Sequence, residues 1–165
     1  MSLYYKLSIL MGFVVVVSNY LVQFPINHLG LNEILTYGAF SYPITFLITD
    51  LANRAYGKPV ARKVVYVGFI IGIILTLVVS TNFSEIISIR IAIGSGLAFF
   101  IAQNLDIKIF DHFRKNRWYV APLTSSILGS TVDTFLFFSI AFYGTGVPWA
   151  TLAIGDLMVK LSITF

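Results

Sequence analysis

Long apolar runs occupy nearly the whole chain, and this feature constrains the fold more than any other. Six windows approach the length of about 20 apolar residues that an α-helix needs to cross a hydrocarbon core of about 30 Å. They lie near residues 5–26, 33–53, 64–82, 86–110, 120–143 and 149–165. Charged residues make up 11% of the 165 positions, against about a quarter in an average soluble domain. We therefore expect residues 1–165 to form a single integral membrane domain.

Runs of this length favour helices over strands, because backbone groups in lipid must find their hydrogen-bond partners within the protein. The strands of a membrane barrel would be about ten residues long and would alternate apolar and polar positions. The first run is too long for a signal-peptide core and no small-x-small cleavage site follows it, so we interpret it as a retained helix. The expected fold class is all-α, a polytopic bundle of six transmembrane helices.

The basic residues predict the direction of these helices. Of the eleven Lys and Arg residues, four fall within 54–63 and four within 108–117, whereas the connections NHLGLNE and GTGVP contain none. Lys and Arg concentrate on the cytoplasmic side of a membrane, so both termini should be cytoplasmic. This topology also accounts for the net charge of +4, and we expect no direct nucleic-acid partner.

The chain is not expected to be an enzyme. It has no cysteine, and its two histidines, His28 and His112, lie in different connections, so neither a disulfide nor a shared metal site is expected. The sequence contains no Walker-type phosphate loop, no HExxH and no GxSxG motif. We predict no catalytic residues, no bound metal and no cofactor, and any coupling to ATP would have to come from another protein.

Polar side chains inside the apolar runs need an explanation, because a charge at mid-bilayer costs about 2.5–3.5 kcal/mol on insertion scales. One interpretation is that such residues only link helices, at about 0.6–2 kcal/mol per hydrogen bond. Their presence in five of the six runs instead favours a shared, partly hydrated cavity for a transported solute. The candidates that share this property are Asn19, Gln23, Asp50, Asn53, Gln103, Asp106, Asp133, Asp156 and Lys160. Asp156 and Lys160 are spaced for an i,i+4 ion pair.

The second apolar run is the most unusual of the six. Gly38 and Pro43 interrupt it, and the missing amide of Pro43 should leave backbone carbonyls free near the middle of the membrane. Broken helices of this kind commonly line the binding sites of transporters. A kink that serves packing alone is the alternative interpretation.

Four blocks resemble, in order, the queuosine-precursor transporter family, which was earlier grouped with vitamin-uptake proteins. The blocks are SNYLVQFP (18–25), TYGAFSYPITFLITDLANRAYGKPVARK (36–63), AQNLDIKIFDHFRK (102–115) and APLTSSILGSTVDTFLFFSIAF (121–142). The resemblance implies a multi-pass protein of the bacterial inner membrane that imports 7-deazaguanine precursors of the tRNA base queuosine, chiefly preQ0 and preQ1. It also implies a bundle similar to the six-helix substrate-binding components of energy-coupling-factor vitamin transporters. Members usually continue beyond the position of Phe165, so we expect a chain that is either truncated or naturally short.

The proposed substrate suggests roles for the polar candidates. A guanine-like edge offers two adjacent N–H donors, which a carboxylate can accept in bidentate fashion. Asp133 is the first candidate for this carboxylate and Asp106 the second, while Asp50 would favour the cationic aminomethyl group of preQ1. The remaining polar edge would be read by Gln103, Asn19 and Gln23, and aromatic residues near the break, Phe40 among them, would stack on the base.

The expected partners are the lipid bilayer and a small 7-deazaguanine base, and a homodimer stays open. Two other functions also stay open at this point. The first is a substrate-binding subunit of an ATP-driven, vitamin-type uptake system, which would bind the base in isolation without transporting it. The second is a structural membrane protein without transport activity, whose polar residues only join helices and whose single Asp→Asn variants would behave as the wild type.

Overall fold

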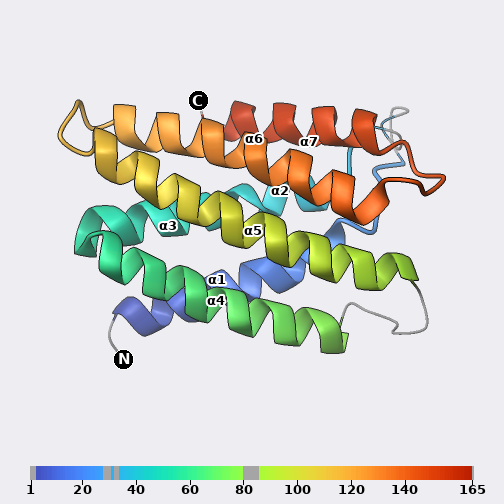
Figure 1. Ribbon diagram of the computed structural model, residues 1–165, viewed down its shortest axis with the longest axis horizontal. Coiled ribbons are helices and arrows are strands. Elements are labelled where there is room, and N and C mark those ends of the chain that lie inside the picture. The colour runs from blue at the N-terminus through green and yellow to red at the C-terminus, as the bar shows by residue number, and fades with distance from the viewer. Residues whose placement is uncertain (1–2, 28–30, 32–33, 80–85, 165) are drawn as a thin grey trace.

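The protein folds as a helical bundle (Figure 1). The computed structural model describes residues 3–27, 31, 34–79 and 86–164, and its regular elements within these ranges are helices apart from one isolated bridge between Pro25 and Thr36. The helices are α1 (Leu3–Leu21), α2 (Gly38–Ser41), α3 (Pro43–Tyr56), α4 (Lys58–Val79), α5 (Ile86–Phe113), α6 (Val120–Phe142) and α7 (Trp149–Thr164). The helix limits expected at 33, 82 and 165, and His28, lie outside the described residues. The all-α prediction is confirmed.

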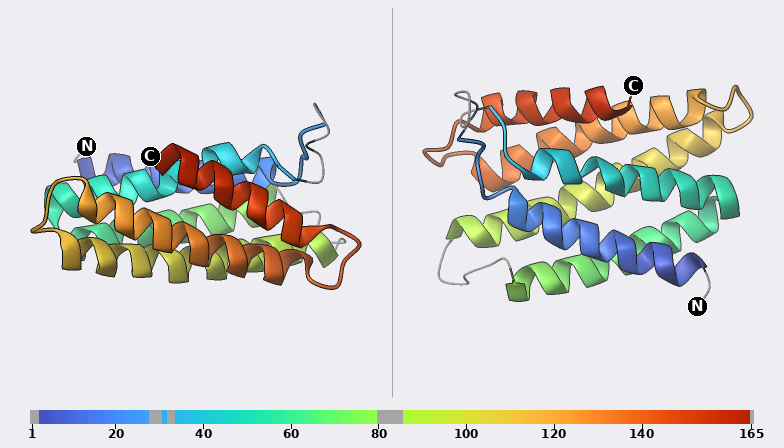
Figure 2. Two further views of the ribbon diagram at one scale, coloured as in Figure 1. Left: turned by 90° about the horizontal axis from the view of Figure 1, so that it is seen from above. Right: turned by 180° about the vertical axis from the view of Figure 1, so that it is seen from behind.

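The helices lie side by side along a common direction (Figures 1 and 2). The pair α1 and α4 forms one side of the bundle and the pair α6 and α7 forms the other. The broken helix α2–α3 and the long α5 run between these pairs and contact both. Both chain termini point toward the end of the bundle where α3 turns into α4 and α5 connects to α6 (Figure 1). That end carries most of the basic residues and is called the basic end below.

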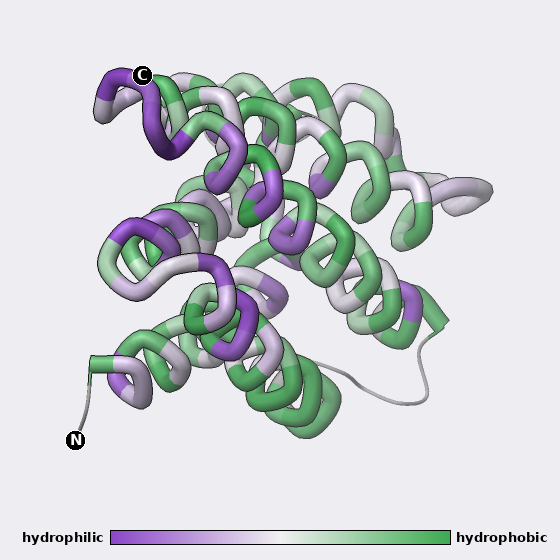
Figure 3. The backbone as a smooth tube through the Cα atoms, turned by 60° about the vertical axis from the view of Figure 1, so that its left-hand side comes forward, coloured by the Kyte–Doolittle hydropathy of each residue, from purple (hydrophilic) through white to green (hydrophobic). Residues whose placement is uncertain are grey.

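The distribution of side chains is the reverse of that in a soluble protein. Large apolar side chains such as Val78, Leu97 and Ile70 are exposed, whereas Asn53, Gln103 and other polar side chains are buried. Figure 3 shows hydrophobic residues along the lengths of the helices and hydrophilic residues concentrated near the termini. An apolar exterior is stable against lipid, and a polar interior is stable only when its groups bond one another. The chain is therefore an all-α membrane protein.

Three described helical stretches are long and apolar enough to cross a membrane, namely Leu3–Leu21, Ile89–Phe113 and Val120–Phe142. The broken second run does not meet the length requirement, because α2 has 4 residues and α3 has 14. α7 has 16 residues, below the length that defines these stretches. A total of six membrane crossings stays a prediction.

Pro43 breaks the second run as its chemistry requires. α2 ends at Ser41 and α3 begins at Pro43, with Tyr42 between them in helical conformation. Pro43 has no amide to donate to the Ala39 carbonyl, so the helix continues in direction but loses one hydrogen bond. The hydroxyls of Ser41 and Thr45 bond the nearby carbonyls of Gly38 and Tyr42 at 3.2 and 2.8 Å. The predicted interruption is confirmed.

Two helix limits differ from expectation for local reasons. α1 ends at Leu21 and not at 26, because the following segment turns and pairs with the chain ahead of α2, where the Tyr37 amide bonds the Phe24 carbonyl at 3.1 Å. α4 begins at Lys58 and not at 64, since Gly57, with a φ of 83°, ends α3 and Pro59 is readily accommodated in a first helical turn. The basic residues expected in a loop therefore lie mostly on helical turns.

Glycines allow α1 and α4 to approach closely. A Cβ atom built at Gly72 would lie 2.7 Å from a methyl group of Val15, and one at Gly68 would overlap Met11. The GxxxG pair of α4 is thus used for packing inside the bundle. One apolar cluster surrounds this contact and a second, on α5, α6 and α7, lies on the other side of the polar interior.

Candidate functional site

A buried ion cluster joins α6 and α7. The Nζ atom of Lys160 lies 2.9 Å from Oδ2 of Asp133 and 2.6 Å from Oδ2 of Asp156, so the expected i,i+4 pair has a third member from another helix. Lys160 also donates to Oγ1 of Thr134 at 3.0 Å, and that hydroxyl donates to Asp156 at 2.7 Å. Mid-helix positions on α6 and α7 hold these groups within the bundle.

The cluster carries two negative charges and one positive charge. Its three charged residues are at most 5% exposed, and an unpaired charge in such a place would be costly. Lys160 compensates both carboxylates through one ammonium group, which leaves the cluster formally negative. Such a cluster can accept a hydrogen-bond donor or a positively charged group.

Two polar atoms beside the ammonium group are without a hydrogen bond. Oδ1 of Asp133 and the hydroxyl oxygen of Tyr42 are buried and have no partner among the described residues. The hydroxyl faces the Asp133 carboxyl closely enough to interact with it, but neither atom has a hydrogen bond of full geometry among the described residues. The ring of Tyr42 lies under Lys160, with Nζ 4.8 Å from its centroid. The site therefore presents one unused acceptor and one unused hydroxyl.

A small cavity adjoins these atoms. It is lined by Ser18, Asn19, Val22, Gly38, Tyr42, Asp133, Phe137, Asp156 and Lys160. Its volume of about 20 Å³ is enough for a single water molecule. The lining comes from α1, the broken helix, α6 and α7, and it combines charged, amide and aromatic groups. We call it the small cavity, and in this conformation it is closed to anything larger than water.

A second acidic group lies between α3, α5 and α6. The Asp50 carboxylate accepts hydrogen bonds from Ser125 at 3.3 Å and from Ser126 at 3.4 Å. Asp106 lies close enough to Asp50 and Ser125 to interact with both, and neither of its oxygens accepts a hydrogen bond of full geometry from a donor of the described residues. Asp106 is fully buried, at 0% exposed.

A cavity of about 460 Å³ opens beside Asp50. Its walls are α3, α6 and the end of α7, and Trp118 and Tyr119 place it at the basic end of the bundle. Ser130 and Ser126 line it from α6, one and two turns from Asp133, which lines the small cavity. We call it the large cavity. One face of α6 thus forms a wall of both cavities.

Other predicted polar residues join helices. Gln103 accepts a hydrogen bond from Thr49 at 2.5 Å and donates one to Thr45 at 3.1 Å, so its amide links α5 to α3. Asn53 donates to the Ile107 carbonyl at 3.3 Å, and its side-chain oxygen has no partner among the described residues. Neither residue lines the small or the large cavity.

The sequence candidates are therefore divided among several places. Asn19, Asp133, Asp156 and Lys160 meet at the small cavity, where Asn19 also donates to Ser95 of α5 at 3.0 Å. Asp50 lines the large cavity, with Asp106 behind it. Gln23 donates to the Asn19 carbonyl at 3.2 Å, and Phe40 is 50% exposed on the outside of the bundle. Neither Gln23 nor Phe40 lines either cavity.

Two polar contributors were absent from the sequence candidates, Ser18 at the small cavity and Thr134 in the adjoining ion cluster, and a third, Tyr42, was expected only to stack on the base. Tyr42 was one of several aromatics near the break, and nothing in the sequence separated it from its neighbours. Thr134 follows Asp133 directly, and adjacent helical residues usually face different partners. Ser18 bonds Ser41 at 2.8 Å across α1 and α2. Two features of the sequence could have pointed to Ser18 and Tyr42, namely the adjacent Ser and Asn at 18–19 and the break at Pro43.

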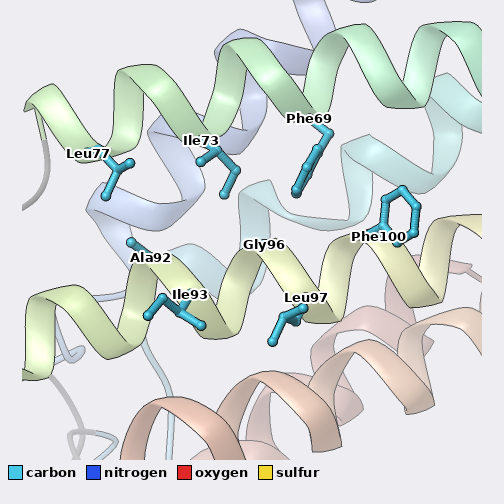
Figure 4. Close-up of a pocket in the computed structure, with 8 residues that line it drawn as sticks. All are labelled: Phe69, Ile73, Leu77, Ala92, Ile93, Gly96, Leu97 and Phe100. Carbon is cyan, nitrogen blue, oxygen red and sulfur yellow. The ribbon is translucent and has the colours of Figure 1, made fainter.

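An apolar groove lies away from these polar groups, between α4 and α5 (Figure 4). It has a volume of about 420 Å³, and its lining includes Phe69, Ile73, Gly96 and Phe100. The lining is hydrocarbon throughout, so it suits a lipid chain and offers nothing to orient a polar base.

Comparisons with known proteins match nearly the whole chain. The family described as "Putative vitamin uptake transporter" matches residues 36–165. The chain is 34% identical to the "Queuosine precursor transporter" of Escherichia coli strain K12, over 96% of this chain and 79% of that protein. It is 37% identical to the "Probable queuosine precursor transporter" of Haemophilus influenzae, over 92% of this chain and 77% of that protein.

A third relative extends the same pattern to another lineage. The chain is 28% identical to the "Probable queuosine precursor transporter" of Bacillus subtilis strain 168, over 96% of this chain and 78% of that protein. No solved structure matches the chain significantly. The resemblance drawn from the four sequence blocks is confirmed by these matches.

Proposed function

This chain belongs to the vitamin uptake transporter family that includes queuosine precursor transporters, and we propose that it imports a 7-deazaguanine precursor of queuosine. The base crosses the membrane unchanged, so the protein acts as a transporter and not as an enzyme. One observation carries the assignment of the site. Oδ1 of Asp133 is buried, without a hydrogen bond of full geometry among the described residues, and belongs to a residue that lines a cavity inside the bundle.

The small cavity has the chemistry to bind one polar edge of the base. Asp133 uses Oδ2 for Lys160, so Oδ1 is left for one N–H of the base, and the expected bidentate contact is reduced to a single one. The Tyr42 hydroxyl can donate to the ring carbonyl that lies next to this N–H in a guanine-like base. Phe137 supplies an apolar wall from α6.

Binding a base in the small cavity requires the helices around it to move. The present volume admits one water molecule, so the structure represents a conformation closed around its polar groups. The break at Pro43 lies directly beside Tyr42 and lacks one helical hydrogen bond, which makes α2 the element best suited to move. We propose that the base passes from the small cavity along α6 into the large cavity.

The charge distribution supports a direction for this movement. The large cavity lies at the basic end of the bundle, together with both termini. Basic segments mark the cytoplasmic side, so the large cavity would release the base into the cytoplasm. The related proteins come from bacteria, and a bacterial inner membrane fits an importer of a nucleobase.

Ligand binding tests the site directly. We expect preQ0 or preQ1, but not guanine, to raise the melting temperature of the purified protein in detergent. Asp133→Asn should abolish the shift, because the neutral amide of asparagine cannot form the ion pair that Asp133 makes with Lys160. Tyr42→Phe should weaken binding by up to about tenfold, which corresponds to one hydrogen bond.

Asp111→Asn is the matched control, since Asp111 is a partly exposed carboxylate paired with Lys58 and Arg114 at the basic end. Its ligand response should equal that of the wild type. An unchanged shift in Asp133→Asn would remove the small cavity as the site. Binding without uptake by liposomes that contain this chain alone would show a capture subunit of an ATP-driven system.

A further inference from the structure

We infer that Asp50 and Asp106 form a proton-carrying pair that couples uptake of the base to entry of protons. This inference rests on the proposed function and adds its energy source. The pair is distinct from the small cavity, since neither carboxylate contributes to its lining. Its evidence is the burial of both groups, the absence of an ion pair and the access that Asp50 has to the large cavity.

The two carboxylates form no ion pair with a cation among the described residues. Asp50 is 7% exposed and Asp106 is 0% exposed. The ion pairs of the described residues involve Asp111, Asp133 and Asp156, and none involves Asp50 or Asp106. This contrasts with the ion cluster of α6 and α7, where Lys160 contacts two aspartates.

Arg54 is the nearest basic residue along α3, and its guanidinium is already engaged. It donates to the Trp118 carbonyl and lies over the ring of Phe110, 5.7 Å from its centroid. Its charge acts on Asp50 from a distance without a direct contact. The neighbouring groups that α6 presents to the pair are the neutral hydroxyls of Ser125 and Ser126.

Two neighbouring carboxyl groups buried without a cation do not both ionise while they are shielded from water, because desolvation and mutual repulsion add. A shared proton removes one charge and lets one oxygen donate to the other group. Asp106 has two buried oxygens without partners among the described residues, so it has the unsatisfied capacity that such a proton would use. The two hydroxyls of α6 stabilise the Asp50 side of the pair.

Asp50 connects this proton to water. It lines the large cavity with Ser126 and Ser130, while Asp106 lies behind it. In the inward step, the proton passes from Asp106 to Asp50 and then to water in the large cavity. The pair regains one proton from water on the other side when the small cavity opens there, so each cycle moves one proton inward and leaves the base unchanged.

Uptake by proteoliposomes tests the coupling. Purified protein is reconstituted with the lumen at pH 8 and the outside at pH 6, and the membrane potential is clamped with valinomycin and equal potassium. Labelled preQ0 and preQ1 are then supplied in separate assays. The wild type should accumulate its base above the external concentration, with a ceiling of roughly tenfold per pH unit for one proton per base. Asp106→Asn should lose this accumulation, and Asp111→Asn, its matched control on α5, should keep it.

The design separates failure of this inference from failure of the proposed function. Exchange of labelled for unlabelled base without a pH gradient reports transport alone, and its absence in the wild type would overturn the proposed function. Exchange without gradient-driven accumulation would overturn the proton-carrying pair and leave the importer intact. Equal accumulation by Asp106→Asn and the wild type would overturn it as well.

A measurement on the wild type covers the case in which Asp106→Asn does not fold. A pH-sensitive dye in the lumen should report acidification when either base is added outside at equal pH on both sides. A lumen pH that stays constant during measurable uptake would contradict the inference.

Discussion

Lys160 is the residue on which the charge balance of the bundle interior depends. Its ammonium group contacts carboxylates on two helices and the ring of Tyr42 next to the break in the second run. A buried ion pair contributes little beyond the cost of its own desolvation, but removal of one partner leaves the other uncompensated. Lys160 therefore holds α7, α6 and the broken helix in one arrangement.

Lys160→Met should strongly destabilise the protein. Breaking a buried ion pair costs about 3–5 kcal/mol, which lowers the melting temperature of a chain this size by roughly 6 °C or more. Thermal unfolding in detergent measures the change. Lys63→Met, at an exposed position of α4, is the matched control and should unfold close to the wild type. An equal melting temperature for both variants would show that the two aspartates need no cation.

Among the elements, α1 and α4 form a tightly packed pair. Three glycines, Gly12, Gly68 and Gly72, face side chains of the partner helix. Close approach brings dispersion contacts along the length of both helices, which is the main source of helix association in lipid. The α2–α3 break has the opposite character, because it lacks a hydrogen bond and adjoins a cavity. The bundle thus combines a tightly packed side with an interrupted one.

Gly72→Val should separate α1 from α4. The new side chain would have to occupy the space of Val15, whose methyl group lies 2.7 Å from a Cβ atom built at this glycine. Overpacking of this kind costs typically about 1–3 kcal/mol. We expect a lower melting temperature and less folded protein in the membrane. Gly146→Ala, where a Cβ atom meets nothing within 4 Å, should change neither, and a stable Gly72→Val would mean that the two helices are loosely packed.

At the scale of the whole molecule, the bundle has two chemically different ends. The basic end holds both termini and the large cavity, and the opposite end holds the connection between α6 and α7, which has no Lys or Arg. Apolar side chains cover the surface between the two ends. Such a molecule has one favoured orientation, in which the basic end stays on the cytoplasmic side.

The orientation can be measured with single cysteines, because the chain has none of its own. A membrane-impermeant maleimide should label Gly146→Cys in intact cells, since this position lies in the exposed connection between α6 and α7. Asn116→Cys, in the exposed connection between α5 and α6, should react only after the cells are permeabilised. The reverse pattern would invert the proposed topology and, with it, the direction of release from the large cavity.

The sequence by itself determined the properties that arise from local chemistry. Apolar runs of membrane length require helices, Pro43 removes one amide from the second run, and the i,i+4 spacing of Asp156 and Lys160 brings their charges together. Four sequence blocks were enough to identify the family. Each of these conclusions depends on residues close together in the chain, so no knowledge of packing was required.

The tertiary structure alone decided how the polar residues are grouped. Asp133 and Lys160 are 27 positions apart and meet only because α6 and α7 pack together, whereas Asp50 and Asp106 meet between α3 and α5. A helix carries polar groups on more than one face, and the neighbour that each face meets depends on the rotation and crossing of helices, which the sequence pattern leaves open. For this reason the polar residues that were predicted to share one site are divided. Some line the small cavity together with Lys160, and Asp50 and Asp106 form a separate pair that has no lysine.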